Sequence, residues 1–535
     1  MKTKTLFVCT VLTALMLASC SKNEKPRYDY DYLPVQISKN DDWSIIDKEG
    51  KEIIKEEYPA DAHLSTIVDG VFWVKQGDSF QLFSIDQPKK SLMDEEFKQA
   101  TPFCAGRAVV SNVNQPISIL DTKGNTVATL PKDISRCYRF EEDGYAIVQN
   151  ADGLMGLIDA QGKMVLKPAY VLLHDYDGIF LALDSIGSKS FSIIDLKGKK
   201  LGEIDITKYT CYGFSENKGI VESGEGDQRH VSVLDKTGKK LFDVKKARKA
   251  QSTYYGGYFV FANEDNKLGV ADDKGEIMIR AKYDGLLNLG NGLFVALKGD
   301  KCGVVDANDE TVLPYDYTDG TNYTLGGNFI MKDGTERMLV DHEGKEIISF
   351  YENGRDDIMY KYVEYVNIEN LVNGLVKQIE LFEQPETAEK VAVRAGLKPE
   401  DCEYKRDIEN SMTIGDKLHV DCRTWFAEPM AEEKTHVEKV NDGWFTEERK
   451  VSDGYHWKSI LPSAVFLEFT VNGLGVSAAE FHKELCAKLA AGRTKQSDQE
   501  FTKSVMAGGQ TLTCQTEAMT GGDHITINLR FQHAQ

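Results

Sequence analysis

Basic residues are fewer than acidic ones in this chain of 535 amino acids. Its 64 lysines and arginines stand against 84 acidic residues, so the formal net charge is −20. A protein that binds nucleic acid must neutralise phosphates, so this charge argues against nucleic acid as the main partner, and we predict none. It also argues against docking on an anionic membrane through a basic patch. Beyond the N-terminal signal, no apolar run approaches the roughly 18 residues that a membrane-spanning helix needs.

Familiar catalytic and metal-binding signatures are missing as well. The ten histidines include no H-x-x-x-H pair, and the chain has no C-x-x-C pair and no G-x-S-x-G turn. These spacings would have indicated zinc binding or a nucleophilic hydrolase. The repeated aspartates described below lack the D-x-D-x-D-G pattern of a calcium loop. We therefore predict no catalytic residues, no cofactor, no metal site and no enzymatic activity.

The first twenty residues indicate the cellular compartment. Lys2 and Lys4 precede an apolar stretch from Leu6 to Leu17, and small residues then lead to Cys20. A basic start, an apolar core of about a dozen residues and a small-residue exit are typical of a secretory signal, which is too short to span a bilayer. The tetrapeptide that ends at Cys20 resembles a bacterial lipobox, and this resemblance implies cleavage before Cys20 and lipidation of that residue.

The predicted N-terminal organisation follows from that resemblance. Residues 1–19 form a signal peptide, and residues 20–29 form a lipidated tether. The lipid at Cys20 is the one membrane attachment that we expect, because each buried methylene contributes about 0.8 kcal/mol and more than one acyl chain makes anchoring stable. We expect a protein of the bacterial cell envelope, anchored at the outer membrane, with periplasmic or surface display left open.

Cysteines are few once Cys9 is removed with the signal and Cys20 is lipidated. An exported chain can form disulfides, but the eight that remain are far fewer than a disulfide scaffold needs. We expect buried free thiols in the first four and leave the disulfide state of the whole set open. The eight are Cys104, Cys137, Cys211, Cys302, Cys402, Cys422, Cys486 and Cys514.

An apolar run that ends in aspartate and leads into a turn recurs along residues 43–345. Clear copies are Ile45-Ile46-Asp47 before Gly50-Lys51 and Leu157-Ile158-Asp159 before Gly162-Lys163. An aspartate can accept hydrogen bonds from amides two or three residues on, and the glycine supplies the positive φ that closes a hairpin. We predict nine structural turn aspartates, spaced 39, 35, 38, 36, 40, 37, 34 and 35 residues apart: Asp47, Asp86, Asp121, Asp159, Asp195, Asp235, Asp272, Asp306 and Asp341.

Other landmarks recur with the same period. A glycine opens an apolar strand, as in Gly144–Val148, and the unit ends in a tail such as Pro314-Tyr315-Asp316. Together these residues resemble the WG repeat family over about residues 30–350. The chain departs from that family at the tryptophan, because only Trp43 occupies the position and Ser44 follows it instead of glycine. The resemblance implies an all-β interaction module and carries no activity.

Units of about 37 residues with three or four short strands cannot each bury a sheet face, so neighbouring units must stack. Closing the stack radially leaves few exposed sheet edges. We predict a mainly β protein with a β-propeller-like array of about nine repeats over residues 30–350. An open superhelical β array is the alternative.

The repeat stops after Gly354, and residues 355–535 mix helical and strand patterns. Ser477, with Glu480 three residues on, is a capping box for a helix. Helix, loop, strand, glycine turn and a cysteine-bearing strand occur at about 386–426 and again at about 477–518, which indicates an internal duplication. We predict a smaller α+β domain, and it resembles no family that we recognise.

These features favour a cell-envelope lipoprotein that acts as a non-catalytic protein-interaction scaffold through its β-repeat array, with an envelope protein as partner. The alternative is a glycan-binding or carbohydrate-active propeller protein that serves nutrient capture. Tyrosines in inter-strand segments either stack on sugar rings or pack between blades. Those tyrosines are Tyr254, Tyr255, Tyr258, Tyr315, Tyr317 and Tyr323.

Overall fold

The computed structural model describes residues 29–533, except residues 177, 291, 355–356, 358, 415–416, 442–445, 473, 475 and 508. The described chain divides into two compact units. The first contains the chain up to Asn112 together with Pro116–Tyr365, and the second contains Val113–Gln115 together with the residues from Val366 onward. No helix among the described residues is long and apolar enough to cross a membrane.

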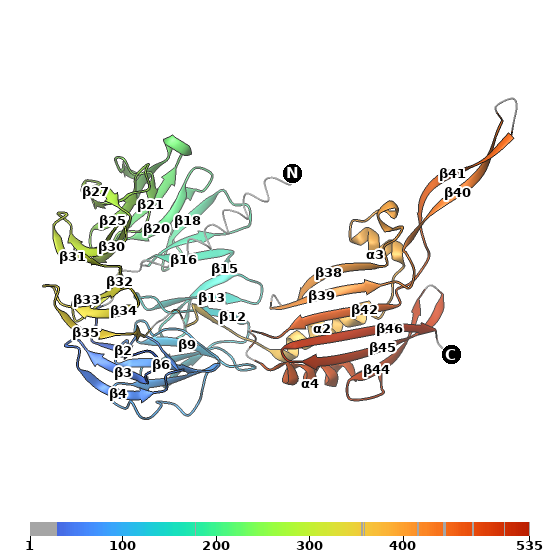
Figure 1. Ribbon diagram of the computed structural model, residues 1–535, viewed down its shortest axis with the longest axis horizontal. Helices are drawn as coiled ribbons and strands as arrows, with labels where there is room; N and C mark the ends of the chain where they lie inside the picture. Colours follow the sequence, from blue (N-terminus) through green and yellow to red (C-terminus); the bar gives the residue numbers. More distant parts are fainter. Residues whose placement is uncertain are drawn as a thin grey trace. The chain divides into compact units, whose positions relative to one another are not determined.

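The first unit is a nine-bladed β-propeller (Figure 1). Nine small sheets follow one another along the chain, and we number them as blades one to nine. The last blade packs on the first: Leu33 and Ile46 of blade one share a core with Leu339 and Phe350 of blade nine. The predicted propeller is therefore confirmed, and the open array is not what forms.

Each blade runs from its innermost strand outward, beginning with the first four blades. Blade one contains β36 (Glu352–Asn353), β2 (Tyr32–Gln36), β3 (Trp43–Asp47) and β4 (Glu52–Tyr58). Blade two contains β5 (His63–Leu64), β6 (Val71–Gln76) and β7 (Ser79–Ser84). Blade three contains β8 (Gln99–Ala100), β9 (Arg107–Ser111), β10 (Ser118–Asp121) and β11 (Thr126–Thr129). Blade four contains β37 (Tyr362–Glu364), β12 (Ile134–Tyr138), β13 (Tyr145–Asn150), β14 (Met155–Asp159) and β15 (Met164–Tyr170).

The remaining blades follow the same order. Blade five contains β16 (Leu172–Tyr176), β17 (Ile179–Leu183), β18 (Ser190–Asp195) and β19 (Lys200–Asp205). Blade six contains β20 (Thr210–Ser215), β21 (Lys218–Ser223), β22 (His230–Asp235) and β23 (Lys240–Asp243), with a 3-10 turn at Gly226–Gln228. Blade seven contains β24 (Lys249–Ala250), β25 (Tyr258–Ala262), β26 (Leu268–Asp272) and β27 (Ile277–Tyr283). Blade eight contains β28 (Gly285–Gly290), β29 (Leu293–Lys298), β30 (Lys301–Asp306) and β31 (Thr311–Tyr317). Blade nine contains β1 (Asp29–Tyr30), β32 (Asp319–Leu325), β33 (Asn328–Asp333), β34 (Glu336–Val340) and β35 (Glu346–Phe350).

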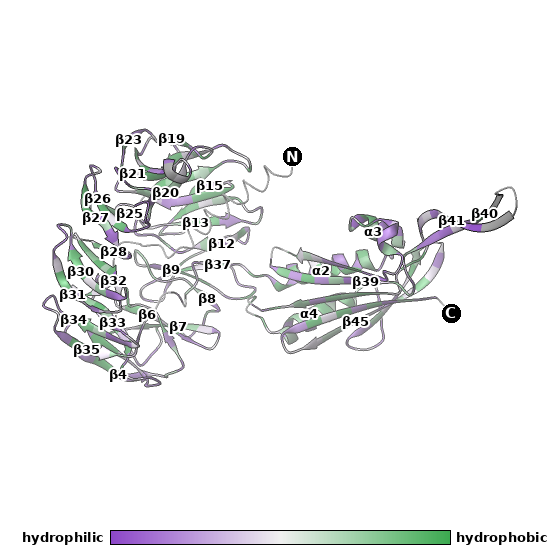
Figure 2. Cartoon of the chain, turned by 45° about the horizontal axis from the view of Figure 1, so that its top comes forward, coloured by the Kyte–Doolittle hydropathy of each residue, from purple (hydrophilic) through white to green (hydrophobic). Residues whose placement is uncertain are grey.

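The middle strands of the blades carry the apolar core (Figure 2). In β22, for example, Val231 and Val233 are fully buried, and Leu234 is 1% exposed. Consecutive residues of a strand point to opposite faces of its sheet, so both faces of this strand are buried. Neighbouring blades cover these two faces, which explains the near-continuous apolar runs before each turn aspartate.

Strands from both ends of the repeat region close the ring. β1 pairs in parallel with β32 of blade nine, and β36 pairs with β2 as the innermost strand of blade one. The Asp29 carboxylate fixes β1 because it accepts hydrogen bonds from Thr324 Oγ1 and from the Gly327 amide, both at 2.7 Å. Each end of the array thus contributes a strand to the blade at the opposite end.

The chain beyond β36 continues along the inner strands, and we call residues 359–365 the strap. The Tyr360 amide donates to the Ala100 carbonyl of blade three at 3.0 Å, and the Lys361 carbonyl accepts from the Arg139 amide at 3.0 Å. β37 then pairs with β12. These hydrogen bonds extend the first unit to Tyr365, whereas the sequence placed the end of the array at 350 and the start of the next domain at 355.

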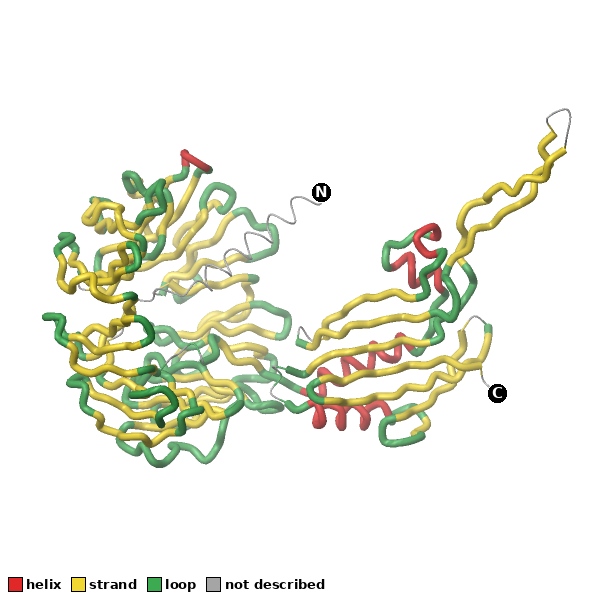
Figure 3. Tube along the Cα trace, in the orientation of Figure 1, coloured by secondary structure: helices red, strands yellow, loops and turns green. Residues whose placement is uncertain are grey.

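The second unit is a seven-stranded sheet with helices on one face (Figure 3). The sheet order is β38-β39-β42-β46-β45-β44-β43. The elements are α2 (Ile368–Phe382), α3 (Ala388–Arg394), a 3-10 turn (Pro399–Cys402), β38 (Asp407–Ile414), β39 (Leu418–Trp425), β40 (Ala431–Asn441), β41 (Thr446–Trp457), β42 (Ala464–Thr470), α4 (Ala478–Leu489), β43 (Thr494–Lys495), β44 (Glu500–Ala507), β45 (Gln510–Gly521) and β46 (His524–His533).

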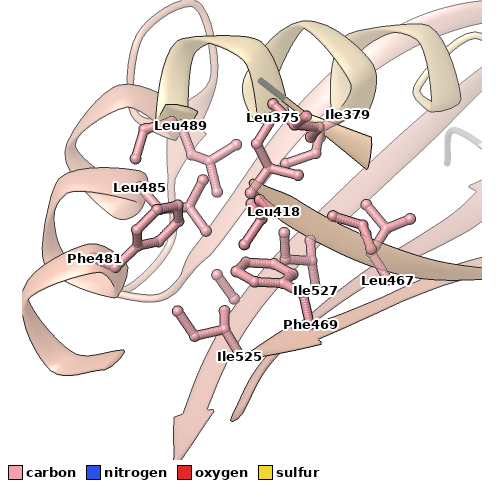
Figure 4. Packing of buried hydrophobic residues seen from close by; sticks show 14 of the residues in the cluster. Leu375, Ile379, Leu418, Leu467, Phe469, Phe481, Leu485, Leu489, Ile525 and Ile527 are labelled. Atoms are coloured by element: carbon pink, nitrogen blue, oxygen red, sulfur yellow. The ribbon is translucent and has the colours of Figure 1, made fainter. Parts of the chain in front are cut away.

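Helices α2 and α4 supply the core over this sheet (Figure 4). Leu375 and Ile379 of α2 lie one turn apart and are fully buried, as are Phe481 and Leu485 of α4. This spacing gives each helix one apolar stripe that faces the strands. The predicted capping box begins α4: the Ser477 hydroxyl accepts the Glu480 amide, and the Glu480 carboxylate accepts the Ser477 amide.

The sheet has two similar halves. α2 with β38, β39 and β42 matches α4 with β44, β45 and β46, and the third strands of the two halves pair at the centre of the sheet. The predicted first copy began at residue 386, close to α3. The partner of α4 is instead α2, because these two helices pack against each other on the same face.

A separate two-stranded ribbon, β40 and β41, leaves the first half between β39 and β42. The described side chains from Glu432 to Glu438 are all exposed. This ribbon was not predicted from the sequence, because its strands lack the alternation of apolar and polar residues that marks a half-buried strand.

Candidate functional site

In eight blades the turn aspartate lies at, or directly after, the end of the strand next to the outermost strand. Their Oδ1 atoms accept the backbone amides of the residues two and four positions on, with N–O distances of 2.8–3.1 Å. In blade five, the Lys199 amide is the main cause that lowers the pKa of Asp195. These carboxylates are engaged within their own turns, which is a structural role and not a metal-ligating one. The eight are Asp47, Asp121, Asp159, Asp195, Asp235, Asp272, Asp306 and Asp341.

The exception among the nine predicted aspartates is Asp86 in blade two. The residue two positions on is Pro88, which has no amide hydrogen to donate. The turn after β7 is closed by Ser84 instead, whose hydroxyl and carbonyl both accept the Gln87 amide at 3.2 Å. The sheet of blade two also has no fourth strand, so this blade lacks both the aspartate turn and the strand that would follow it.

Seven of these turns contain a glycine with positive φ, and in most of them the glycine also permits a close contact. A Cβ added at Gly162 in blade four would lie 2.6 Å from the Cβ of Ala128, on the outer strand of blade three. Likewise, a Cβ at Gly275 in blade seven would lie 2.6 Å from the Phe242 ring of blade six. Six of the seven glycine turns pack closely on the preceding blade in this way, whereas Gly344 makes only ordinary contacts. The sequence indicated only the φ requirement.

Charged and aromatic side chains connect the strap to blade four. Arg136 Nε donates to Glu364 Oε1 at 2.5 Å, and the Arg136 guanidinium lies 5.3 Å from the centre of the Tyr362 ring. The rings of Tyr362 and Tyr138 are 5.2 Å apart. Burial lowers the pKa of Arg136, but the hydrogen bond and the charge of Glu364, with the two tyrosines, together outweigh it and leave the pKa raised. These groups satisfy one another and hold the strap in place.

The tyrosines considered for glycan stacking are buried or half-buried. Tyr254 is fully buried, and the Tyr258 ring lies 5.9 Å from that of Phe294 in the next blade. Tyr315 donates its hydroxyl to that of Tyr283, and the Tyr323 hydroxyl accepts a hydrogen bond from Asn353. The four tyrosines named here pack within and between blades, which is the alternative that the sequence left open.

All eight cysteines of the described chain are free thiols, and all but Cys104 are buried. Burial raises the pKa of Cys211, Cys302 and Cys514 to about 12. A thiol with so high a pKa is protonated at neutral pH, and only the thiolate is a strong nucleophile. These cysteines therefore serve as small core residues.

One cysteine, Cys486, lies next to a histidine, His482, one turn earlier on α4. The spacing of four residues could have indicated this pair, but it was not among the predicted sites. Cys486 Sγ is 3.5 Å from His482 Nε2, and the same nitrogen is 2.9 Å from the Ala518 carbonyl. A carbonyl accepts hydrogen bonds, so Nε2 carries the proton and cannot act as a base toward the thiol. Burial also raises the pKa of Cys486, and the pair is not a catalytic dyad.

The second unit contains a polar cleft of about 570 Å³. Its lining includes Asn114, whose side-chain oxygen accepts the Ile368 amide at the start of α2 at 2.9 Å. Two of its carboxylates are engaged, because Glu369 binds Lys488 and Glu480 caps α4. No three metal-ligating side chains among the described residues are grouped so as to hold an ion. The predicted lipidation site, Cys20, lies outside the described residues.

Fold and turns together define a β-propeller built from a repeated hairpin unit. Residues 269–302, from β26 into β30, match the WG containing repeat, so the predicted WG repeat is confirmed. No curated protein matches the chain.

Solved structures with a similar fold share little sequence with the chain. BamB from Moraxella catarrhalis is 13% identical, with 48% of this chain and 87% of that chain covered and a TM-score of 0.31. A eukaryotic initiation factor is 10% identical, with 61% and 98% covered and a TM-score of 0.44. A quinonprotein alcohol dehydrogenase-like protein from Bacteroides thetaiotaomicron is 10% identical, with 63% and 77% covered and a TM-score of 0.24.

Proposed function

We propose that the chain is a cell-envelope lipoprotein that acts as a non-catalytic protein-interaction scaffold through its propeller. The observation that carries this proposal is the closed ring of nine repeat blades, because repeat arrays offer partners a broad surface. Eight turn aspartates are engaged within their own turns, and the tyrosines that favoured a glycan are buried or half-buried. Exposed apolar side chains such as Ile186 and Leu241, which are 80% and 48% exposed, remain available to a protein partner.

The proposed anchor fits the start of the propeller. Asp29 opens β1 nine residues after Cys20. Nine residues of extended chain reach about 30 Å, so a lipid at Cys20 would keep blade nine close to the membrane. This distance supports an envelope protein that presents its propeller next to the bilayer.

Lipidation is tested by metabolic labelling with a radioactive fatty acid. We expect the wild-type protein to be labelled and to sediment with membranes. The Cys20→Ser variant should carry no label, whereas the control Cys104→Ser should be labelled like the wild type. An unlabelled wild-type protein would refute the anchor.

The scaffold role is tested by crosslinking the full chain in intact envelopes and identifying what it captures. We expect one or a few specific proteins, and we expect Ile186→Glu or Leu241→Glu to lower their recovery. Lys197→Glu is the surface control for a general charge effect. Recovery of no protein, together with binding to a glycan array, would refute the scaffold and support the glycan alternative.

A further inference from the structure

We propose that β38 pairs antiparallel with the β38 of a second copy of the chain and joins two second units into one sheet. This inference concerns the second unit and does not depend on the proposed function of the propeller. It starts from the position of β38 as the last strand of the sheet, next to β39 (Figure 1).

The outer edge of β38 is long and regular. Its eight residues pair with β39 without a register shift, from Asp407 opposite Trp425 to Ile414 opposite Leu418. The Phe426 amide donates to the Arg406 carbonyl at 2.7 Å, and hydrogen-bonded positions alternate along an antiparallel pair. The backbone groups of Asp407, Glu409, Ser411 and Thr413 therefore face away from β39.

Other edges of the described chain carry devices that block such pairing. The outer strand pair has a register shift in all eight blades that possess a fourth strand, and bulges of this kind disfavour edge-to-edge contact. At the opposite end of the same sheet, β43 covers Phe501 and Thr502 of β44, and Lys503 follows. The ribbon strands β40 and β41 carry several lysines. β38 contains no proline, lysine, arginine or bulge.

The sequence of β38 is complementary to itself. A two-fold axis through Ser411 pairs the outward-facing backbone groups of Glu409 with those of Thr413 of the second copy, and gives about six hydrogen bonds. On the helix-covered face, Ile408 then lies opposite Ile414 of the second copy, and Asn410 lies opposite Met412. No carboxylate faces another carboxylate, so like charges do not oppose the pairing. A second copy is therefore the partner that this edge fits.

The helix-covered face of β38 is apolar at three of its four positions and can continue into a neighbouring strand. Ile408 and Ile414 are 2% and 8% exposed, and Met412 packs half-buried on the main core of the unit. Between them Asn410 is exposed, so the helices do not fully cover the middle of the strand. A paired strand would bring Met412 of the second copy onto this uncovered position.

Crosslinking of the full chain tests the pairing. In a Cys104→Ser background, Ser411→Cys should give a covalent dimer with a short bismaleimide. The matched control is Ser504→Cys, an exposed serine on β44. We expect at least tenfold more dimer from Ser411→Cys than from Ser504→Cys. Equal yields, or crosslinking of Ser411→Cys to another protein only, would overturn the assignment of a second copy.

Sedimentation equilibrium of the same chain in detergent gives an independent measurement. Ser411→Pro removes an amide that faces outward and leaves the β38–β39 ladder intact, as edge positions tolerate proline. We expect this variant to be monomeric where the wild type is dimeric. Ser411→Thr should remain dimeric, and circular dichroism shows whether each variant is folded. A monomeric wild type would overturn the proposal.

Discussion

A fully buried ion pair connects the two halves of the second unit. Glu383 follows α2, and its side chain is 0% exposed; Arg493 follows α4, and its side chain is 1% exposed. Arg493 donates through Nε to Oε1 at 2.6 Å and through Nη2 to Oε2 at 3.0 Å. Thr516 adds a hydrogen bond to Oε1, and Lys503 adds one to Oε2. Burial and bidentate geometry together make each charge depend on the other.

Glu383→Gln keeps the shape of the side chain and removes its charge. The variant leaves the Arg493 guanidinium buried without a counter-charge, and loss of one partner of a buried pair typically costs about 3–5 kcal/mol. Arg493→Met should cost a similar amount. Apolar replacement of a whole buried pair is often close to neutral, so Glu383→Leu combined with Arg493→Met should cost less than about 3 kcal/mol. The two effects are therefore strongly non-additive.

Hydrogen exchange of the full chain in increasing urea measures these changes separately in each unit. The slowest amides of β45 and β46 report the free energy of unfolding of the second unit, and propeller amides provide an internal reference. Glu369→Gln is the matched control, because the Glu369–Lys488 pair also connects α2 and α4 but lies on the surface. A loss below about 1 kcal/mol for Glu383→Gln, or additivity of the two single changes, would refute the reasoning.

Three further changes test the packing and the titrating groups. Gly162→Ala should destabilise the propeller by about 2–4 kcal/mol in urea unfolding, because the new Cβ clashes with Ala128 and the residue keeps a positive φ. Gly144→Ala, whose Cβ would meet open space, should show only the φ cost of about 1–2 kcal/mol. Equal losses for the two variants would contradict the close contact. Burial lowers the pKa of His174 to about 4, so protons bind the unfolded chain first as the pH falls below about 6.5, and stability should fall by up to about 3 kcal/mol between pH 6.5 and 4. His174→Leu should flatten this pH dependence. It should also raise stability at neutral pH, because His174 Nε2 is buried without a hydrogen-bond partner within the described chain. An unchanged dependence of stability on pH in the variant would contradict the role of His174. Hydrogen bonds to Glu438 and Asp453 raise the pKa of His436, so its contribution to the ribbon is present below pH 6.5 and is lost as the pH rises through the folded-state pKa. NMR titration should show a raised pKa. His436→Gln should abolish the pH dependence of ribbon amide protection, measured relative to the intrinsic exchange rate.

Local chemistry explains why the sequence predicted the blades. An aspartate and the amides that it binds lie within five residues, and this turn recurs in eight of the nine blades, seven of them with the turn glycine. The failure at Asp86 was also visible in the sequence, because Pro88 removes one of the two donors that the turn needs. The turn motif thus reports directly on the strand pair that it connects.

Long-range pairings left no comparable pattern. β1 and β36 contain two residues each, and their partners lie about three hundred positions away in sequence. The burial of Glu383 was equally invisible, since a lone glutamate after a helix reads as a solvated residue. Ring closure and buried charge depend on residues that meet only in the folded chain, and neither periodicity nor turn chemistry encodes them.

Asp309 shows how the contact between blades shapes the repeat. It occupies the turn position that seven other blades fill with glycine, and its φ is +68°. Its carboxylate accepts hydrogen bonds from the Tyr283 hydroxyl at 2.7 Å and from Lys282 Nζ at 2.6 Å, both on the preceding blade. The side chain therefore replaces the close glycine contact with direct bonds to the same outer strand.

Variants at Asp309 separate backbone strain from these bonds. Asparagine tolerates the left-handed region and keeps an oxygen for Tyr283, so Asp309→Asn should be close to wild type in urea unfolding of the propeller. Asp309→Ala keeps the strained φ and loses the bonds, and it should cost about 2–3 kcal/mol. Asp309→Gly loses the bonds but relieves the strain, so it should fall between the other two. A glycine variant as unstable as the alanine variant would show that φ strain contributes nothing, and one more stable than wild type would show that the bonds to blade seven do not stabilise the ring.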